Sequence, residues 1–138
     1  MNFSRAKGPV TVLIADDDPM ALDVLASTLE PEGYSVVKAQ GGKKAVELAM
    51  EQKPNLLILD LIMPDFSGFD VVQELRQHPE TKDIPILIFT GKDITSEDKA
   101  RLNDHIQAIT SKASFSREGF IQEIKRLEQL LPSNGIHP

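Results

Sequence analysis

Acidic side chains directly follow two of the short apolar runs in this chain. Asp16 and Asp17 come after the run Val10–Ala15, and Asp60 comes after the run Leu56–Leu59. An ionised carboxylate beside a dry core is costly unless a cation or hydrogen-bond donors meet it. A hard divalent cation such as Mg²⁺ would meet this need, because it takes several carboxylate oxygens as ligands. These residue types therefore indicate a magnesium site.

A carboxylate in such a site can also act as a nucleophile toward a phosphoryl group. Phosphoryl transfer mainly requires positioning and neutralisation of the charge on the phosphoryl oxygens. Thr90, at the end of another apolar run, offers a hydroxyl for a hydrogen bond, and Lys112 offers an ammonium group. Taken singly, each of these residues is more often an ordinary capping or surface residue. Their order at the ends of successive strands favours a functional site.

The elements that must position these residues alternate between strand and helix. We expect strands at 10–15, 34–39, 55–60, 84–90 and 106–110, and helices beginning near Asp18, Gly41, Ser67, Thr95 and Ser116. Strict alternation predicts a parallel sheet with right-handed crossovers and helices on both faces. At this length the common solution is the α/β, flavodoxin-like (βα)5 sandwich with strand order 2-1-3-4-5. That order brings the carboxyl ends of strands one, three, four and five to one edge.

Length and composition narrow the class of protein. The 138 residues suit one domain, for which we expect a flexible lead-in at 1–9, the folded domain at 10–131 and a tail at 132–138. The absence of cysteine excludes disulfides, thiolate zinc sites and cysteine nucleophiles, and it fits a reducing compartment such as the cytoplasm. A net charge of −6 argues against a nucleic-acid surface. No apolar run approaches the roughly 20 residues of a membrane span.

Four motifs together resemble receiver domains of bacterial two-component response regulators. They are Val12-Leu-Ile-Ala-Asp16-Asp17-Asp18-Pro19, Leu59-Asp60-Leu-Ile-Met63-Pro64-Asp-Phe-Ser-Gly68, Ile88-Phe-Thr90-Gly91 and Lys112. The resemblance covers about residues 10–131, and the stretch 90–103 is also similar to receivers attached to hybrid histidine kinases. It implies that Asp60 is the phospho-acceptor. It further implies that Asp17 and Asp60 bind Mg²⁺ with the Ile62 carbonyl, while Asp16 takes part through a bound water.

The same resemblance implies that Thr90 and Lys112 contact the phosphoryl oxygens. The donor would be a histidine kinase or a phosphotransfer protein. The chain would catalyse its own aspartyl phosphorylation and dephosphorylation without turning over an external metabolite. Phosphorylation would change the surface of the fourth helix and fifth strand, which an effector domain or a downstream protein would recognise. The sequence leaves the kinase, the output and the oligomeric state open.

Two positions depart from the family pattern. The family commonly has an aromatic residue where Ile109 stands, and Lys-Pro where Lys112-Ala113 stands. We therefore expect an aliphatic switch residue and a smaller movement. A cis bond costs about 0.5–1 kcal/mol before proline but about 3–4 kcal/mol before other residues. We accordingly expect the Lys112–Ala113 bond to be trans.

Three other functions fit parts of the pattern. A flavin-binding module on this fold would need a Ser/Thr/Gly-rich phosphate loop, whereas three aspartates follow the first strand here. An aspartate-nucleophile phosphatase normally has an acid two residues after the nucleophile, where this chain has Ile62. A docking module that works without phosphorylation would not need the complete acidic set. These comparisons favour the phospho-accepting domain.

Overall fold

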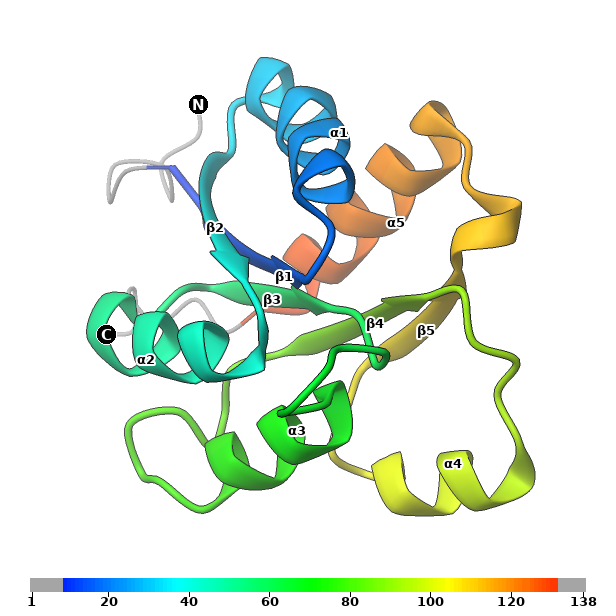
Figure 1. Cartoon of the computed structure of the whole chain (residues 1–138). Coiled ribbons are helices and arrows are strands. Elements are labelled where there is room, and N and C mark those ends of the chain that lie inside the picture. The colour runs from blue at the N-terminus through cyan, green and yellow to red at the C-terminus, as the bar shows by residue number, and fades with distance from the viewer. Residues whose placement is uncertain (1–8, 132–138) are drawn as a thin grey trace.

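Five parallel strands form one sheet in the order β2-β1-β3-β4-β5 (Figure 1). In this computed structural model the described residues are 9–131. The strands are β1 (Thr11–Asp16), β2 (Ser35–Gln40), β3 (Leu56–Leu59), β4 (Ile86–Thr90) and β5 (Ala108–Ser111). The α/β class and the strand order are those predicted from the sequence. The expected lead-in at 1–9 and tail at 132–138 lie outside the described residues, except for Pro9.

Helices cover both faces of the sheet. They are α1 (Pro19–Leu29), α2 (Gly42–Gln52), α3 (Gly68–Arg76), α4 (Ser96–Leu102) and α5 (Arg117–Gln129), with short 3-10 helices η2 (Glu30–Glu32) and η3 (Lys112–Ser114). Helices α1 and α5 lie on one face, and α2, α3 and α4 lie on the other (Figure 1). Among residues 9–131 no helix combines the length and the apolar character that crossing a membrane requires.

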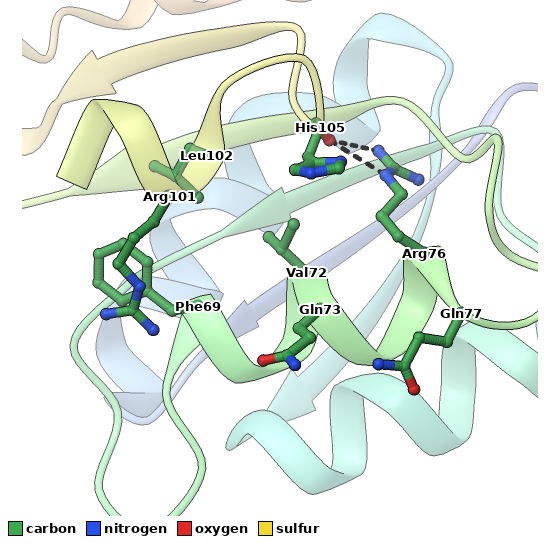
Figure 2. A pocket seen from close by; sticks show the side chains of 8 residues that line it. All are labelled: Phe69, Val72, Gln73, Arg76, Gln77, Arg101, Leu102 and His105. Carbon is green, nitrogen blue, oxygen red and sulfur yellow. Dashed lines mark hydrogen bonds between the residues drawn. The ribbon is translucent and has the colours of Figure 1, made fainter. Parts of the chain in front are cut away.

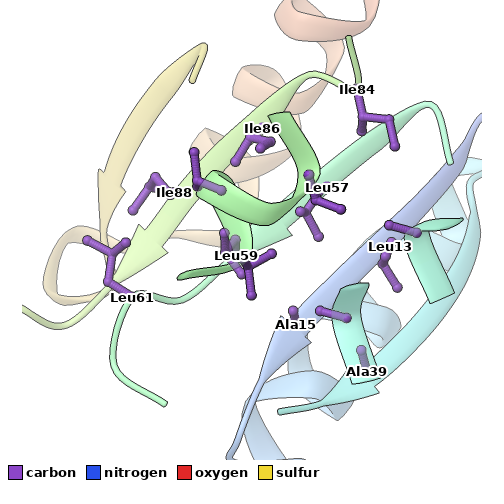
Figure 3. Packing of buried hydrophobic residues seen from close by; sticks show 14 of the residues in the cluster. Leu13, Ala15, Ala39, Leu57, Leu59, Leu61, Ile84, Ile86 and Ile88 are labelled. Carbon is purple, nitrogen blue, oxygen red and sulfur yellow. The ribbon is translucent and has the colours of Figure 1, made fainter. Parts of the chain in front are cut away.

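The central strands are buried on both faces, which explains their continuous apolar sequence. All four residues of β3 are buried. Leu57 and Leu59 pack toward α2 and α3, in the cluster shown in Figure 3, whereas Leu56 and Ile58 pack toward α1 and α5. Burying one such side chain stabilises the fold by about 1.5–3 kcal/mol relative to leaving it exposed. This core fixes the strand ends that carry the polar residues.

Side-chain caps begin α1, α3 and α5 at the expected positions. Asp18 accepts a hydrogen bond from the Met20 N–H at the start of α1, and Ser67 forms a reciprocal capping box with Asp70 at the start of α3. Ser116 caps α5 by accepting from the Gly119 N–H. Each cap satisfies a backbone donor that a helix start leaves without a partner.

In α4, Ala100 is exposed, and the buried residues are Leu102 and Asp98. The burial of a charged residue is possible because Asp98 has hydrogen-bond partners on both its carboxylate and its main chain. No peptide bond within residues 9–131 is cis, so the prediction for Lys112–Ala113 is confirmed.

Candidate functional site

The carboxyl ends of three neighbouring strands bring the predicted residues to one edge of the sheet. Asp16 ends β1, Asp60 directly follows β3, and Thr90 ends β4. Asp60 is tied to its neighbour strand because its N–H donates to the Ala15 carbonyl at 3.1 Å. Lys112 begins η3 immediately after β5. The ends of three strands and the start of η3 thus converge on one point.

The Lys112 ammonium bridges two buried carboxylates. Its Nζ lies 2.7 Å from Asp16 Oδ2 and 3.0 Å from Asp60 Oδ2. Asp16 is 2% exposed and Asp60 is 5% exposed. Burial raises the pKa of Asp16, although the hydrogen bond from Lys112 opposes the shift. Burial alone would lower the pKa of Lys112, but hydrogen bonds to both carboxylates and their charges outweigh burial and raise the pKa.

The second oxygen of each buried carboxylate is held by the main chain. Asp16 Oδ1 accepts from the Asp18 N–H at 3.0 Å, and Asp60 Oδ1 accepts from the Ile62 N–H at 3.2 Å. Both carboxylates therefore have fixed orientations. The role of the Ile62 carbonyl as a metal ligand stays a prediction. Ile62 itself is 54% exposed.

Asp17 completes a group that fits a hard divalent cation. One carboxylate oxygen from each of Asp16, Asp17 and Asp60 lies within 4.8 Å of the other two. The one ammonium of Lys112 balances only one of these three negative charges. Oxygen ligands and an excess of negative charge suit Mg²⁺ or Ca²⁺ rather than a softer metal. The predicted set of aspartates is thus assembled in space.

Thr90 reaches the site edge but is linked to α4. Its side chain is fully buried, and its Oγ1 accepts from the Lys92 N–H at 3.2 Å. Lys92 Nζ donates to Asp98 Oδ2 at 2.7 Å, and the same oxygen accepts from the Thr95 N–H at 3.0 Å. Sequence reasoning missed this link. The Thr95-x-x-Asp98 spacing of a capping box was the signal that could have indicated part of it.

Gly68 has a steric role that sequence reasoning also missed. A Cβ atom there would collide with the Asp60 carbonyl oxygen and lie 2.7 Å from Leu61 Cα. The Gly68 N–H donates to the Leu61 carbonyl at 3.1 Å. Helix α3 therefore begins directly against the main chain of Asp60, and only glycine allows this approach.

Comparisons with known proteins point to one family. The model described as the response regulator receiver domain matches residues 12–125. The chain is 35% identical over 133 residues to the probable transcriptional regulatory protein TcrX of Mycobacterium tuberculosis, covering 96% of this chain and 54% of that protein. It is 39% identical over 82 residues to the protein PilH of Pseudomonas aeruginosa, covering 59% of this chain and 68% of PilH. The chain thus spans about half the length of TcrX, and 39% of RpaA of Synechocystis, a DNA-binding transcriptional regulator.

Solved structures of the same kind superpose closely. The chemotaxis protein CheY4 of Vibrio cholerae gives a TM-score of 0.79 at 27% identity, covering 86% of this chain and 98% of that chain. The response regulator protein TrrA of Thermotoga maritima, solved in complex with Mg(2+)-BeF, gives a TM-score of 0.75 at 28% identity, again covering 86% and 98%.

Proposed function

The chain belongs to the response regulator receiver domain family, and from this membership we propose that it accepts a phosphoryl group on Asp60 in a two-component phosphorelay. The observation that carries the proposal is the Lys112 ammonium placed between Asp16 and Asp60 at the edge of the sheet. A nucleophilic carboxylate and a cation for the phosphoryl oxygens then stand side by side. We take residues 10–131 as the receiver domain and the cytoplasm as its place of action.

Each residue has a proposed task in the transfer. Asp60 forms the new P–O bond while the P–N bond of the donor phosphohistidine breaks, and the imidazole takes the electron pair of that bond. Mg²⁺, held by Asp16, Asp17, Asp60 and the Ile62 carbonyl, would supply charge neutralisation at the phosphoryl oxygens. Lys112 neutralises a further oxygen, and Thr90 donates a hydrogen bond once its hydroxyl turns inward. In hydrolysis, water attacks phosphorus, the P–O bond to Asp60 breaks, and inorganic phosphate leaves as the Asp60 carboxylate is restored.

The test of the acceptor uses acetyl phosphate as donor, so that no partner protein is required. Wild type treated with acetyl phosphate and Mg²⁺ is expected to gain the mass of one phosphoryl group, in an acid-labile form. Asp60→Asn is expected to gain none. Asp65→Asn is the matched control, because Asp65 lies in the same loop, is exposed, and has a positive φ of 70° that asparagine tolerates. Equal, Mg²⁺-dependent labelling of Asp60→Asn would disprove the assignment.

We propose that the phosphoryl-donor protein binds to α1, beside the acidic site. Met20 and Val24 are 73% and 49% exposed, large fractions for apolar side chains. Both line a cavity of about 280 Å³ that also includes Lys112 and Phe115. A donor histidine must approach Asp60 across this surface, and exposed apolar side chains there can be buried against a partner.

A charged substitution on this surface separates docking from chemistry. The donor for this test is a histidine kinase that phosphorylates the wild type. Met20→Asp is expected to slow phosphoryl transfer from this kinase about tenfold, because one apolar contact with the kinase is lost. Labelling by acetyl phosphate should not change. Leu130→Asp is the control, because Leu130 is 66% exposed at the far end of α5. If both donors are slowed equally by Met20→Asp, the surface does not act in docking.

Docking without phosphorylation is the alternative function. It would not require three carboxylates, a lysine and a buried threonine hydroxyl at one strand edge, and the complete set argues against it. The output of the phosphorylated form is proposed to pass through α4 and β5, where Ile109 is 37% exposed. Either an attached effector domain or a downstream protein would receive it.

A further inference from the structure

A groove between α3 and α4 shares no lining residue with the acidic site. Its cavity of about 340 Å³ is within the usual size of ligand sites, about 300–1,000 Å³. Apolar side chains form the inner part of the lining, and polar and basic side chains surround them (Figure 2). The eight lining residues are Phe69, Val72, Gln73, Arg76, Gln77, Arg101, Leu102 and His105.

The charge of the groove is opposite to that of the chain. The lining includes two arginines and no acidic residue, whereas the chain has a net charge of −6. The neighbouring carboxylates of α3 are engaged elsewhere. Asp70 takes part in the cap with Ser67, and Glu74 lies 2.9 Å from His78 Nε2. The lining of the groove is therefore basic, on a chain with a net negative charge.

Arg76 brings a cation to one end of the groove and, within residues 9–131, forms no salt bridge with a carboxylate. Its guanidinium donates to main-chain carbonyls: to His105 at 2.6 and 3.1 Å, to Lys82 at 2.8 Å and to Thr81 at 3.3 Å. Burial lowers the pKa of Arg76, and the charge of Asp83 offsets this only in part. The positive charge is thus positioned by neutral oxygens.

Arg101 supplies the second cation at the other end. Its guanidinium carbon lies 4.0 Å from the centre of the Phe69 ring, which is cation–π geometry (Figure 2). In the described part of the chain Arg101 forms no salt bridge. Stacking on the ring leaves the edges of the guanidinium, where its N–H groups lie, available to a bidentate acceptor.

We propose that this groove binds an acidic peptide segment of a partner protein. An apolar side chain of the peptide would lie against Phe69, above the buried Val72 and Leu102. A carboxylate of the peptide would pair with Arg101. Arg76, four of whose N–H groups already donate to main-chain carbonyls, would add positive charge at the other end. The lining follows α3 from Phe69 to Gln77, a length of about 12 Å, which matches about four residues of extended peptide.

The two glutamines of the groove support a peptide over a compact anion. Gln73 and Gln77 are four residues apart and so lie along one side of α3. Their amide groups both donate and accept hydrogen bonds, as a peptide main chain requires. A phosphate or acetate ion would use the arginines but neither the glutamines nor the apolar lining. The proposal does not depend on phosphorylation of Asp60.

The test is titration of the ¹⁵N-labelled chain, residues 1–138, with a capped six-residue peptide of alternating glutamate and leucine or phenylalanine. Amide shifts are expected at 69–77 and 101–105. Arg101→Glu should weaken binding about tenfold or more, as expected for loss of a charge-assisted hydrogen bond. Lys99→Glu is the matched control, since it makes the same charge change on an exposed residue of α4 outside the lining. Gln73→Glu, on the exposed side of α3, is expected to weaken binding as well.

Each outcome decides the proposal. Shifts at the groove with weakening by Arg101→Glu and Gln73→Glu but little change with Lys99→Glu support it. Equal weakening by Lys99→Glu would show general charge attraction and overturn it. Sodium acetate that reproduces the shifts would reduce the site to a small-anion site and overturn the peptide assignment. Absence of binding, or shifts elsewhere on the molecule, would also overturn it.

Discussion

The Asp60 carboxylate contacts a cation through one oxygen and the main chain of Ile62 through the other. Lys112 contacts its Oδ2, while the following loop places Ile62 two residues away with its N–H on Oδ1 and its side chain 54% exposed. In the phosphorylated protein, hydrolysis requires a water molecule aligned behind the phosphorus atom. We expect the aliphatic side chain of Ile62 to offer that water no hydrogen bond and to help exclude it.

The first prediction concerns the lifetime of the aspartyl phosphate. Self-dephosphorylation of wild type is expected to be slow, and Ile62→Asn is expected to accelerate it by about tenfold, because the amide can orient water. The measurement is loss of acid-labile phosphate by intact mass after removal of the donor. Leu130→Asn is the control, being the same type of change at an exposed residue far from the site. An unchanged or slower rate in Ile62→Asn would show that Ile62 does not govern water access.

At the scale of elements, the start of α3 determines how the Asp60 loop is placed. Gly68→Ala is expected to lower the free energy of unfolding by about 1–3 kcal/mol, because the new Cβ meets the main chain of Asp60 and Leu61. Urea denaturation measures this difference. Gly91→Ala is the control, since a Cβ at Gly91 has no neighbour within 4 Å. Equal effects of the two substitutions would contradict the steric explanation.

The start of α4 depends on the charge of one buried aspartate. The pKa of Asp98 lies below its usual value of 3.8, chiefly because Lys92 donates a hydrogen bond to the carboxylate and also because the Thr95 N–H does. The folded state therefore binds this proton less readily than the unfolded state. The stabilisation is complete above the unfolded pKa and is lost as the pH falls through the lower folded value.

This sign leads to a pH prediction for α4. Amide shifts of residues 95–102 are expected to titrate with a midpoint below 3.8. Asp98→Asn should remove that titration. It should also destabilise the start of α4 at neutral pH, because the charged acceptor for Lys92 is lost. Asp70→Asn, the same change in the capping box of α3, is the control and should leave the α4 amides unaffected. A midpoint above 3.8, or a titration that survives in Asp98→Asn, would contradict the assignment.

Sequence patterns predict the elements well where one local cause determines them. The doubly buried β3 produces an uninterrupted apolar run, and Asp18 and Ser67 mark helix starts because a cap needs only the next three residues. The alternation of strands and helices along the sequence then predicts that Asp16, Asp60 and Thr90 lie at strand ends. Helix α4, with seven residues, has too few apolar positions for its sequence to define a buried face.

Other features depend on contacts between elements and leave no local pattern. The need for glycine at position 68 arises only when α3 meets the main chain of Asp60. The groove requires α3 and α4 to pack at a particular separation, with Arg101 over Phe69. The bridge from Lys112 to Asp16 spans most of the chain, and its distances could not be predicted although its members could.

At the scale of the whole molecule, α4 connects the proposed phosphorylation site with the groove that we propose binds a peptide. Its first turn is linked to Thr90 through Lys92, and its last turn lines the groove against α3. Helix α4 packs less extensively than the central elements, with Leu102 as its one buried apolar residue in the described chain. A change at Thr90 can therefore move α4 while the sheet stays fixed.

The last prediction is the extent of that movement. Mg²⁺ with beryllofluoride, as a phosphoryl mimic on Asp60, should draw the Thr90 hydroxyl inward and break its hydrogen bond with the Lys92 N–H. Beyond the metal loops themselves, amide shifts should cluster between Thr90 and Ala113, and they should be smaller than in a receiver with an aromatic switch residue, because Ile109 is aliphatic. Residues 42–52 of α2, on the other side of α3, should shift little, and Asp60→Asn should show no response. Shifts confined to residues 16–18 and 60–62 would mean that the mimic binds without moving α4, and the proposed route to the output surface would be wrong.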